Sequence, residues 1–497
     1  MEKKKHKTIS EYSQRIDSTD RNDWQHLTDP VLLHIFSYLD KHELNSVCRT
    51  CKKWYRIAQD ESLWKELTYR NLGCRYPRHD VSWKSELKRL TYHAPIHLHQ
   101  TCEGHLDEIY YVCFSNSGKL IATCGADGIV KVWKYGHTTA LLHSRQVVDT
   151  PSYANYVEFN EAETHLIMNC MMREDSEEES QAALAVLAIE KGLAVVAARH
   201  SWFSYFRGTW LTSDTFLLAD VSTYFFSNDN VKLVSCKFYE EELENPELYK
   251  RPLVENLTDD NVELWSLLEM INDGYRPHLV KVIEWSKWNR DSPIERMASS
   301  LPGERVVIIY QQSLEWDIVH RLVFYKVDIY SETPSVTEPI KIIMINSECV
   351  GVNLSADHRY AVYNSRRICV DGWYEQDVDT MVINLANIGE KPEVFEGNKS
   401  LEKSAKLFYL FPSISSDFLA SGSEQDVAFL WDRHSKHVIA TLPHTLPDAK
   451  NGVGAVAFHP HDPEVLISVA DDCRVRIWTS KNRERQFKLQ SDIPNCE

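Results

Sequence analysis

The sequence predicts a multidomain protein in which a small α-helical unit and a linker helix precede a large all-β domain. Three observations predict it. Apolar residues recur at three- and four-residue steps between Trp24 and Leu67, which is typical of amphipathic helices. From His97 the pattern changes to short apolar strands separated by turns. Similar strand patterns, each ending in Trp, then recur near both ends of the second part, which indicates internal repeats.

Composition and charge favour folded domains that bind protein. Hydrophobic residues make up 43% of the 497 residues and charged residues 26%, both ordinary for globular domains. Residues 1–96 hold 18 Lys and Arg against 13 Asp and Glu (+5), which leaves 37 against 59 (−22) for the remainder. Because affinity for phosphate backbones depends on accumulated Lys and Arg, we expect no nucleic-acid partner for the acidic part.

Neither a membrane segment nor a secretion signal is predicted. No apolar run approaches the roughly 18 residues of a membrane helix, and polar residues follow the basic residues at the N-terminus. We therefore expect a cytosolic or nuclear protein and a polar, disordered tail over residues 1–22.

The first hundred residues predict three short helices and a linker. The first stripe is formed by Leu27, Val31, Leu32, Ile35, Phe36 and Leu39. Thr28 or Asp29 can cap this helix, with Pro30 near its first turn. A second stripe runs from Leu44 to Ile57, and a third holds Leu63, Trp64 and Leu67. Three such helices bury little surface alone, so we expect a partner to cover the rest.

These residues carry a family resemblance. Leu27 to Asp40, Val47 to Trp54 and Leu63-Trp64 together resemble an F-box, which we place at residues 23–68. The resemblance implies docking to the Skp1 adaptor, which connects F-boxes to cullin-1 and its RING subunit. Thr28 stands where the family usually has proline. The implied Skp1-binding residues are Leu27, Pro30, Leu32, Ile35, Phe36, Leu39, Leu44, Val47, Trp54 and Trp64.

Residues 69–96, with Trp83, Leu87 and Leu90 at helical spacing, are expected to form the helical linker. The twelve cysteines are scattered and are expected to be reduced. Cys48 and Cys51 form a CxxC without a second ligand pair, so we interpret them as helix positions and expect neither a metal nor a cofactor.

The second part resembles WD repeats. Residues 104–133 match a complete repeat, residues 444–478 a second, and residues 418–432 a third in which Gln425 replaces the usual Asp. The resemblance implies a hydrogen-bonded set of His, Ser or Thr, Asp and Trp in each complete copy. The implied structural residues are His105, Thr123, Asp127 and Trp133, then His444, Ser468, Asp472 and Trp478, with Trp431 in the third copy.

We therefore expect a WD40 β-propeller of seven blades over residues 97–485, followed by a C-terminal tail over residues 486–497. The segment from Ile96 to Cys102 is expected to complete the blade that ends near Trp478. Two insertions are expected. One lies near residues 172–182, around an acidic run at 174–179. The other lies near 240–300 and is expected to carry a helix with Leu264, Leu267, Leu268 and Ile271 at helical spacing.

An F-box followed by WD repeats resembles the F-box/WD repeat-containing family. That resemblance implies a non-catalytic substrate receptor of an SCF ubiquitin ligase, whose propeller holds the protein to be ubiquitinated and degraded. It also implies centriole-assembly and actin-regulating targets, and a centrosomal or nuclear location beside the cytoplasmic one. A link to cullin-4 through DDB one stays open, although Arg433 follows Trp431-Asp432 directly and the usual Arg stands one residue later.

Two other function classes were weighed. One is a Skp1-binding scaffold for cytoskeletal or trafficking complexes, without ligase function. An enzyme built on a propeller would need converging acid, base or metal groups, and no such pattern is found. The target-binding residues stay unknown. Arg366, Arg367, Arg474 and Arg476 are candidates for binding phosphate or carboxylate groups, although Arg474 and Arg476 fit a solvated surface better.

Overall fold

The computed structural model of the chain separates into two compact units, Met1–Arg89 and Leu90–Glu497. The structure describes residues 27–73, 78, 81–149, 152–173, 180–201, 207–221, 231–238, 262–270, 275–284, 304–313, 320–330, 339–345, 347–368, 374–400, 409–444 and 452–491. The expected tail at residues 1–22 and the acidic run at 174–179 lie outside these residues.

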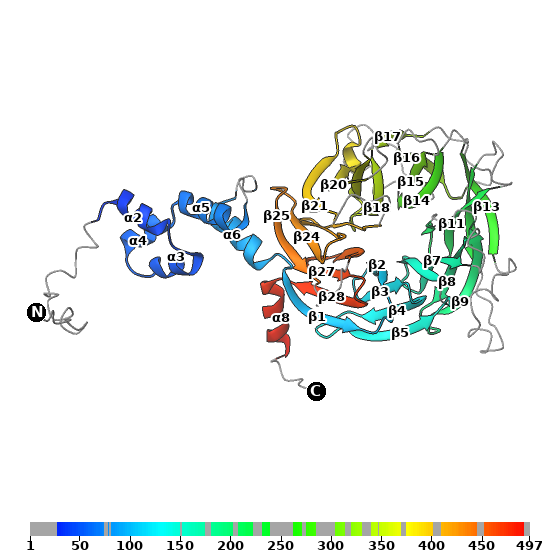
Figure 1. Cartoon of the computed structure of the whole chain (residues 1–497), viewed down its shortest axis with the longest axis horizontal. Helices are drawn as coiled ribbons and strands as arrows, with labels where there is room; N and C mark the ends of the chain where they lie inside the picture. The colour runs from blue at the N-terminus through cyan, green and yellow to red at the C-terminus, as the bar shows by residue number, and fades with distance from the viewer. Residues whose placement is uncertain are drawn as a thin grey trace, which may run out of the picture. The chain divides into compact units, whose positions relative to one another are not determined.

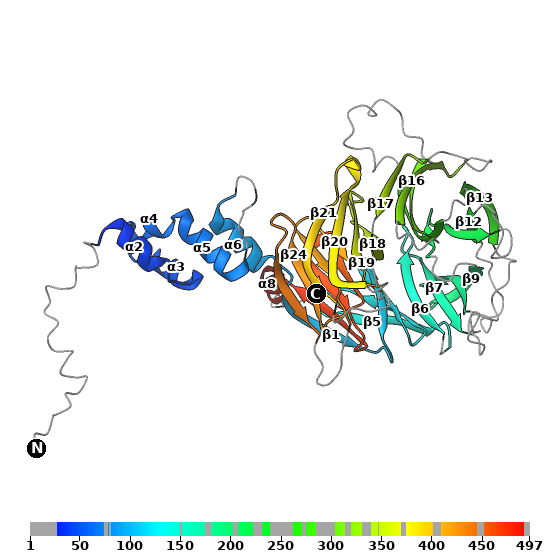
Figure 2. The same cartoon turned by 45° about the horizontal axis from the view of Figure 1, so that its top comes forward.

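The first unit is helical. Its helices are α2 (Asp29–Phe36), α3 (Lys41–Val47), α4 (Lys52–Ala58), α5 (Glu61–Leu72) and α6 (Trp83–Tyr92), the last of which crosses the unit boundary. Helix α4 packs against both α2 and α3 (Figure 2). Asp40 begins α3 with a capping box, because its carboxylate accepts the amides of His42 and Glu43 while Glu43 accepts the amide of Asp40.

The helix boundaries differ from the sequence-based ones. Helix α5 continues to Leu72, past the boundary expected at residue 68, and ends at Gly73 in a left-handed conformation (φ +66°) that glycine adopts without cost. The expected linker over residues 69–96 is therefore not one helix, since α6 begins only at Trp83.

The second unit is a seven-bladed propeller of four-stranded antiparallel sheets (Figure 1), which confirms the expected fold. Blade 1 contains β2 (Ile109–Phe114), β3 (Leu120–Gly125), β4 (Ile129–Lys134) and β5 (Ala140–Gln146). Blade 2 contains β6 (Tyr153–Phe159), β7 (His165–Arg173), β8 (Ser180–Ala188) and β9 (Ala194–Ser201). Blade 3 contains β10 (Thr209–Trp210), β11 (Thr215–Val221), β12 (Val231–Phe238) and β13 (Val262–Met270).

Four blades complete the ring. Blade 4 contains β14 (Tyr275–Glu284), β15 (Glu304–Ser313), β16 (His320–Asp328) and β17 (Lys341–Ile345). Blade 5 contains β18 (Glu348–Leu354), β19 (Tyr360–Ile368), β20 (Tyr374–Asn384) and β21 (Glu393–Lys399), with a 3₁₀ turn at Leu385–Asn387. Blade 6 contains β22 (Ser413–Ile414), β23 (Phe418–Ser421), β24 (Val427–Asp432) and β25 (Val438–Pro443). Blade 7 contains β26 (Ala455–His459), β27 (Asp462–Val469), β28 (Arg474–Thr479) and β1 (His97–Glu103).

The ring closes within blade 7. Strand β1 pairs antiparallel with β28, with Leu98 opposite Trp478 and Cys102 opposite Val475, which confirms the expected closure. The first strands of the blades (β2, β6, β10, β14, β18, β22 and β26) each contact the first strand of the next blade, and β26 contacts β2. These seven inner strands therefore surround the propeller axis, and no blade is left with an open face.

The helix expected within the insertion near residues 240–300 is wrong. Residues 262–270 form the outer strand of blade 3, because Leu264 and Leu268 pair with Cys236 and Leu233 of β12. Strand β14 is the inner strand of blade 4, so residues 262–284 include parts of two blades. The other expected insertion, near residues 172–182, overlaps the paired ends of β7 and β8 at Arg173 and Ser180, and its acidic run lies outside the described residues. Ile271 lies outside the described residues.

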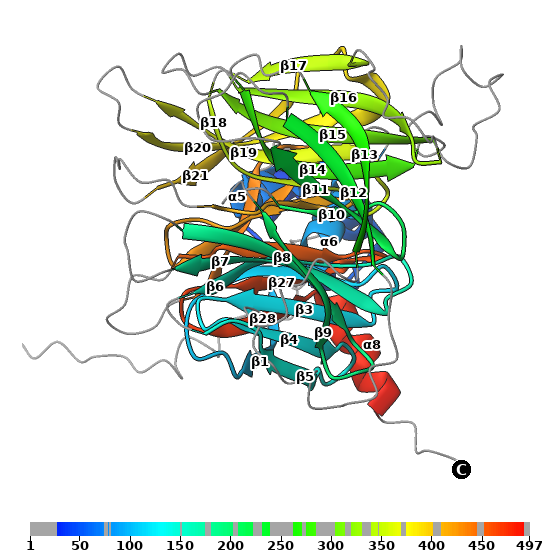
Figure 3. The same cartoon turned by 90° about the vertical axis from the view of Figure 1, so that its right-hand side faces the viewer.

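The expected tail after residue 485 is also wrong, since helix α8 spans Lys481–Ser491. Figures 1 and 3 show α8, in red, beside β1 and β28. Phe487 is buried and its ring contacts those of His99 and His137, at centroid distances of 5.0 and 5.4 Å. This aromatic contact holds α8 against the outer strand of blade 7 and the turn between β4 and β5 of blade 1.

Candidate functional site: the helical unit and the propeller axis

Helix α2 has two apolar sides. Leu32 and Phe36 are buried in the core of the helical unit, where the ring of Phe36 meets that of Trp54 edge to face at 5.5 Å. Val31 and Ile35 lie four residues apart on the other side of α2 and Tyr38 follows just after the helix; Val31 and Tyr38 are 45% and 71% exposed. We name Leu27, Val31, Ile35 and Tyr38 the α2 stripe. Solvent-exposed apolar surface of this kind is typical of an interaction site.

The structure divides the residues expected to bind Skp1 into three groups. Five are buried within the unit: Leu32, Phe36, Leu44, Val47 and Trp64. Four are half-buried: Leu27, Ile35, Leu39 and Trp54. Pro30 is exposed. The expected set left out Val31 and Tyr38, because a continuous apolar pattern does not say which side of a helix faces the core. The buried residues hold the accessible ones in position and are not themselves exposed to a binding partner.

Polar contacts fix α2 against α4. The Lys53 ammonium donates to the carbonyl of Leu27 at 2.6 Å, and the Arg56 guanidinium pairs with the Asp29 carboxylate. Thr28 is the N-cap of α2, but its side chain makes no capping bond. The turn that lacks the usual proline is thus held by Asp29 and its partners on α4. Cys48 and Cys51 lie at the end of α3 and the start of α4, as caps and not within helices.

In blade 1 the structure brings the four expected residues together. The His105 ring bonds the Asp127 carboxylate through Nδ1 and the Thr123 hydroxyl through Nε2, both at 2.8 Å. The Trp133 indole N–H donates to the same hydroxyl at 3.0 Å. Asp127 also accepts the amides of Leu106 and Ile129, and hydrogen bonding to His105 lowers its pKa despite burial. All four side chains are buried, so the set ties β3 and β4 to the turn between them and to the segment that precedes β2.

Blade 7 departs from the expected set. Ser468 accepts from the Trp478 indole and bonds His444 Nε2, each at 2.7 Å, as expected. However, His444 Nδ1 faces the carbonyl of Leu442 at 2.9 Å, and Asp472 instead bonds Arg476. The prediction that Asp472 belongs to this set is wrong, because its carboxylate pairs with the buried Arg476. Burial lowers the pKa of His444 to about 4.

The third copy holds its turn without an Asp. Ser423 accepts the amide of Gln425 at 3.1 Å and donates to the carbonyl of Val427 at 2.5 Å. The Trp431 indole donates to the carbonyl of Glu396 on β21 of the neighbouring blade, at 2.8 Å. Trp431 therefore joins blades 5 and 6, a role that its place in the repeat did not predict.

Two of the four candidate arginines are buried and paired. Arg366 bonds Glu424 at 2.7 Å and Ser400 at 2.9 Å, so its donors are used within the propeller. Arg476 is 5% exposed, which corrects the expectation of a solvated side chain. Arg474 pairs with Glu103 of β1 at 3.1 Å, and Arg367 has a 70% exposed side chain that lies 3.8 Å from Asp379.

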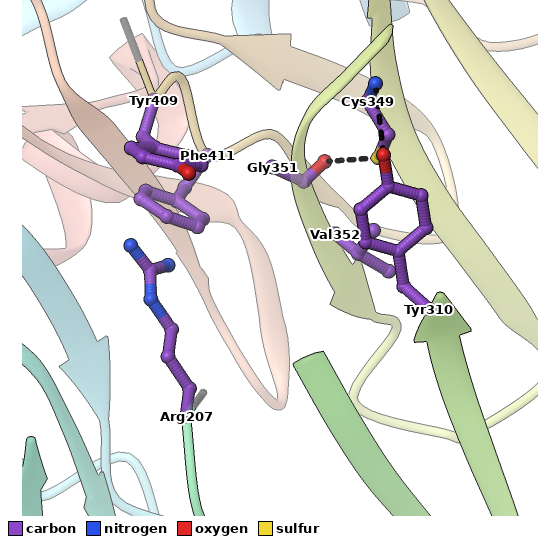
Figure 4. Close-up of a pocket in the computed structure, with 7 residues that line it drawn as sticks. All are labelled: Arg207, Tyr310, Cys349, Gly351, Val352, Tyr409 and Phe411. Carbon is purple, nitrogen blue, oxygen red and sulfur yellow. Dashed lines mark hydrogen bonds between the residues drawn. The ribbon is translucent and has the colours of Figure 1, made fainter. Parts of the chain in front are cut away.

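A pocket lies at the propeller axis (Figure 4). It is lined by Arg207, Tyr310, Cys349, Gly351, Val352, Tyr409 and Phe411. Its cation, Arg207, directly precedes the inner strand of blade 3 and is 4% exposed. Burial lowers the pKa of this guanidinium from its usual value. Sequence reasoning missed Arg207, because no repeat or periodic pattern marks it and its neighbours come from distant blades.

The shape of the pocket depends on Gly351. A Cβ at this position would lie 2.3 Å from the carbonyl oxygen of Leu410, well inside van der Waals contact. The absence of a side chain lets β18 approach the segment that carries Tyr409 and Phe411, and the amide of Leu410 donates to the carbonyl of Val350 at 2.7 Å. Two blades thus meet closely beside Arg207.

Comparisons with known proteins agree with this architecture. The model of the F-box-like family matches residues 24–70, and the model of the WD domain, G-beta repeat, matches residues 97–134 and 440–479. The chain joins an F-box-like motif to a WD-repeat propeller. F-box/WD repeat-containing protein 5 of Homo sapiens is 23% identical to it, over 94% of this chain and 96% of the relative. The same-named protein of Mus musculus is 22% identical, over 91% and 93%.

A partial relative is GID complex subunit 7 of Schizosaccharomyces pombe, 30% identical over 40% of this chain and 34% of its own length. The resemblance to the F-box/WD repeat-containing family that the sequence indicated is thereby confirmed. An F-box-like motif joined to a propeller supports a substrate-receptor role, and this architecture is typical of non-catalytic adaptors.

Among the described helices, none is long and apolar enough to cross a membrane. Within the described ranges, no three His, Cys, Asp or Glu side chains gather as a metal site would require.

Proposed function

We propose that this chain is the substrate-recognition subunit of an SCF-type ubiquitin ligase, in which the F-box docks Skp1 and the propeller binds the protein to be ubiquitinated. The accessible α2 stripe carries the proposal. Ubiquitin transfer would belong to the RING subunit and its E2, while this chain would raise the effective concentration of target lysines. Such a receptor would direct its targets to degradation in the cytoplasm, including at the centrosome, or in the nucleus.

The docking face is the accessible side of the F-box unit. Leu27, Pro30, Ile35, Leu39 and Trp54 would contact Skp1 together with Val31 and Tyr38. Leu32, Phe36, Leu44, Val47 and Trp64 would act indirectly, by holding the helices in place. Burial of the exposed Val31 and Tyr38 side chains against a partner would favour binding, by about 25 cal/mol for each Å² of apolar surface removed from water.

The test is binding of the purified full chain to Skp1 and cullin-1. We expect Val31→Asp with Tyr38→Ala to weaken Skp1 binding at least about tenfold, since about 1.4 kcal/mol suffices for that and a charge would be placed in an apolar interface. The matched control, Asn45→Asp with Tyr330→Ala, changes exposed residues outside the α2 stripe and should bind normally.

Each outcome has a definite meaning. Unchanged binding by the α2 variant would refute the assigned docking face, and no binding by the unaltered chain would refute the Skp1 proposal. Skp1 binding without recruitment of cullin-1 would instead favour a Skp1-binding scaffold for cytoskeletal or trafficking complexes. Recruitment of DDB one and cullin-4 in place of cullin-1 would favour the second ligase link.

A further inference from the structure

We propose that the axial pocket binds a carboxylate of the target protein, with Arg207 as its anchor. This inference rests on the proposed receptor function and specifies which chemical group the propeller would recognise. It assigns the role to a residue outside the four arginines that the sequence suggested.

The guanidinium of Arg207 has no polar partner in the described part of the chain. Its contacts are aromatic ring faces, with centroids 4.3 Å away for Phe411, 5.1 Å for Tyr409 and 5.7 Å for Tyr156. No hydrogen bond or ion pair joins it to any described residue, although it is 4% exposed. Figure 4 shows it extending toward Tyr409 and Phe411, with Gly351 and Tyr310 across the open space.

Stacked rings do not satisfy an arginine. The faces of the rings attract the charge of the guanidinium, but they do not replace hydrogen-bond acceptors for its five N–H groups. The Arg207 nitrogen atoms are not among the fully enclosed unpaired atoms of the described residues, so they are open to an acceptor that enters the pocket. A carboxylate meets this requirement with two parallel hydrogen bonds.

The neighbouring acid does not neutralise Arg207. Glu158 on β6 accepts from the Tyr156 hydroxyl at 2.5 Å, accepts from the Thr209 hydroxyl at 3.1 Å, and lies 3.3 Å from the Lys281 ammonium. Lys281 and Glu158 therefore compensate each other. Among the residues that line the pocket none is acidic, so the charge of Arg207 has no counterpart there.

A carboxylate fits this setting better than a phosphate. A phosphate carries a charge of about −1.5 to −2 and is usually held by several cationic donors, whereas this lining supplies one. The remaining lining is aromatic or apolar and would pack against the methylene groups of a Glu or Asp side chain. The target would therefore present an acidic side chain beside apolar residues.

Peptide libraries can test the assignment. The full chain is immobilised and exposed to three labelled libraries of random peptides that differ only at a fixed central residue: Glu, Gln or phosphoserine. We expect the Glu library to be retained about tenfold more than the Gln library, the factor for one charge-assisted pair. Arg207→Gln should abolish the preference, and Arg359→Gln, which changes an exposed arginine just before β19, should keep it.

A second measurement needs no variant. Sodium acetate should displace the Glu library from the unaltered chain, while acetamide with sodium chloride at the same ionic strength should not. Equal retention of the Glu and Gln libraries, or equal displacement by acetate and acetamide, would overturn the proposal. Stronger retention of the phosphoserine library would overturn the assignment to a carboxylate in favour of phosphate. Skp1 binding is measured separately on the same full chain, so failure of one proposal is distinguishable from failure of the other.

Discussion

The Thr123 hydroxyl is the centre of the hydrogen-bonded set in blade 1, and its removal should destabilise the propeller. With Nδ1 of His105 donating to Asp127, Nε2 accepts from Thr123, and Thr123 accepts from the Trp133 indole. Thr123→Val keeps the side-chain shape but leaves two buried groups without partners. Each such group costs about 1–3 kcal/mol, and the added methyl group returns about 1 kcal/mol. We therefore expect a loss of about 1–5 kcal/mol in the free energy of unfolding.

Urea unfolding of the full chain, followed by circular dichroism in the β-sheet band, measures this loss. Thr101→Val is the matched control, because Thr101 is exposed on β1 and the same exchange there removes no buried hydrogen bond. The control should stay within about 0.5 kcal/mol of the unaltered chain. A Thr123→Val variant as stable as the Thr101→Val variant would refute the claim that this set contributes to stability.

Two further predictions concern blade 7. The pKa of His444 is about 4 in the folded chain, against an ordinary value of 6.5. As the pH falls, the unfolded chain therefore binds a proton at His444 before the folded chain does. The free energy of unfolding should decrease between pH 6.5 and 4, by up to about 1.4 kcal/mol per pH unit. In urea titrations His444→Gln should show a correspondingly shallower loss, and equal slopes would contradict this. Burial raises the pKa of Asp471 to about 6, so protonation of Asp471 increases stability as the pH falls. Asp471 is present in both the unaltered chain and the His444→Gln variant, so its effect cancels in the comparison. Phe487→Ala should release α8 and speed proteolysis at residues 481–491, whereas unchanged cleavage would show that the Phe487 contact is dispensable.

Local repeats allowed much of the propeller to be predicted. The blade 1 set lies within 29 consecutive residues, from His105 to Trp133, so spacing alone identifies it. Blade 3 was harder, because Leu264 and Leu268 are compatible with a helix until β12 provides a pairing strand. Non-local pairing decided the outcome there, as it often does for outer strands.

The two candidate sites also differ in how far the sequence predicts them. The F-box pattern located α2, but not which of its two apolar sides faces solvent, since that depends on α4. The pocket was invisible in the sequence because Arg207 meets Tyr156 and Phe411, which lie 51 and 204 residues away along the chain. A single arginine in a degenerate repeat cannot be assigned to a site from the sequence, because the propeller fold is what brings its neighbours together.

The pairing of β1 with β28 also sets the order in which the protein can mature on the ribosome. Strand β1 begins at His97 and its partner ends at Thr479, so 479 − 97 = 382 residues must be synthesised before the two can meet. At about 5–20 residues per second this takes roughly 20–80 s. The helical unit precedes β1 and can be complete throughout that interval. If the helical unit binds Skp1 as proposed, a nascent or prematurely terminated chain would thus present it before any ring existed to hold a target, and would compete with finished chains for Skp1.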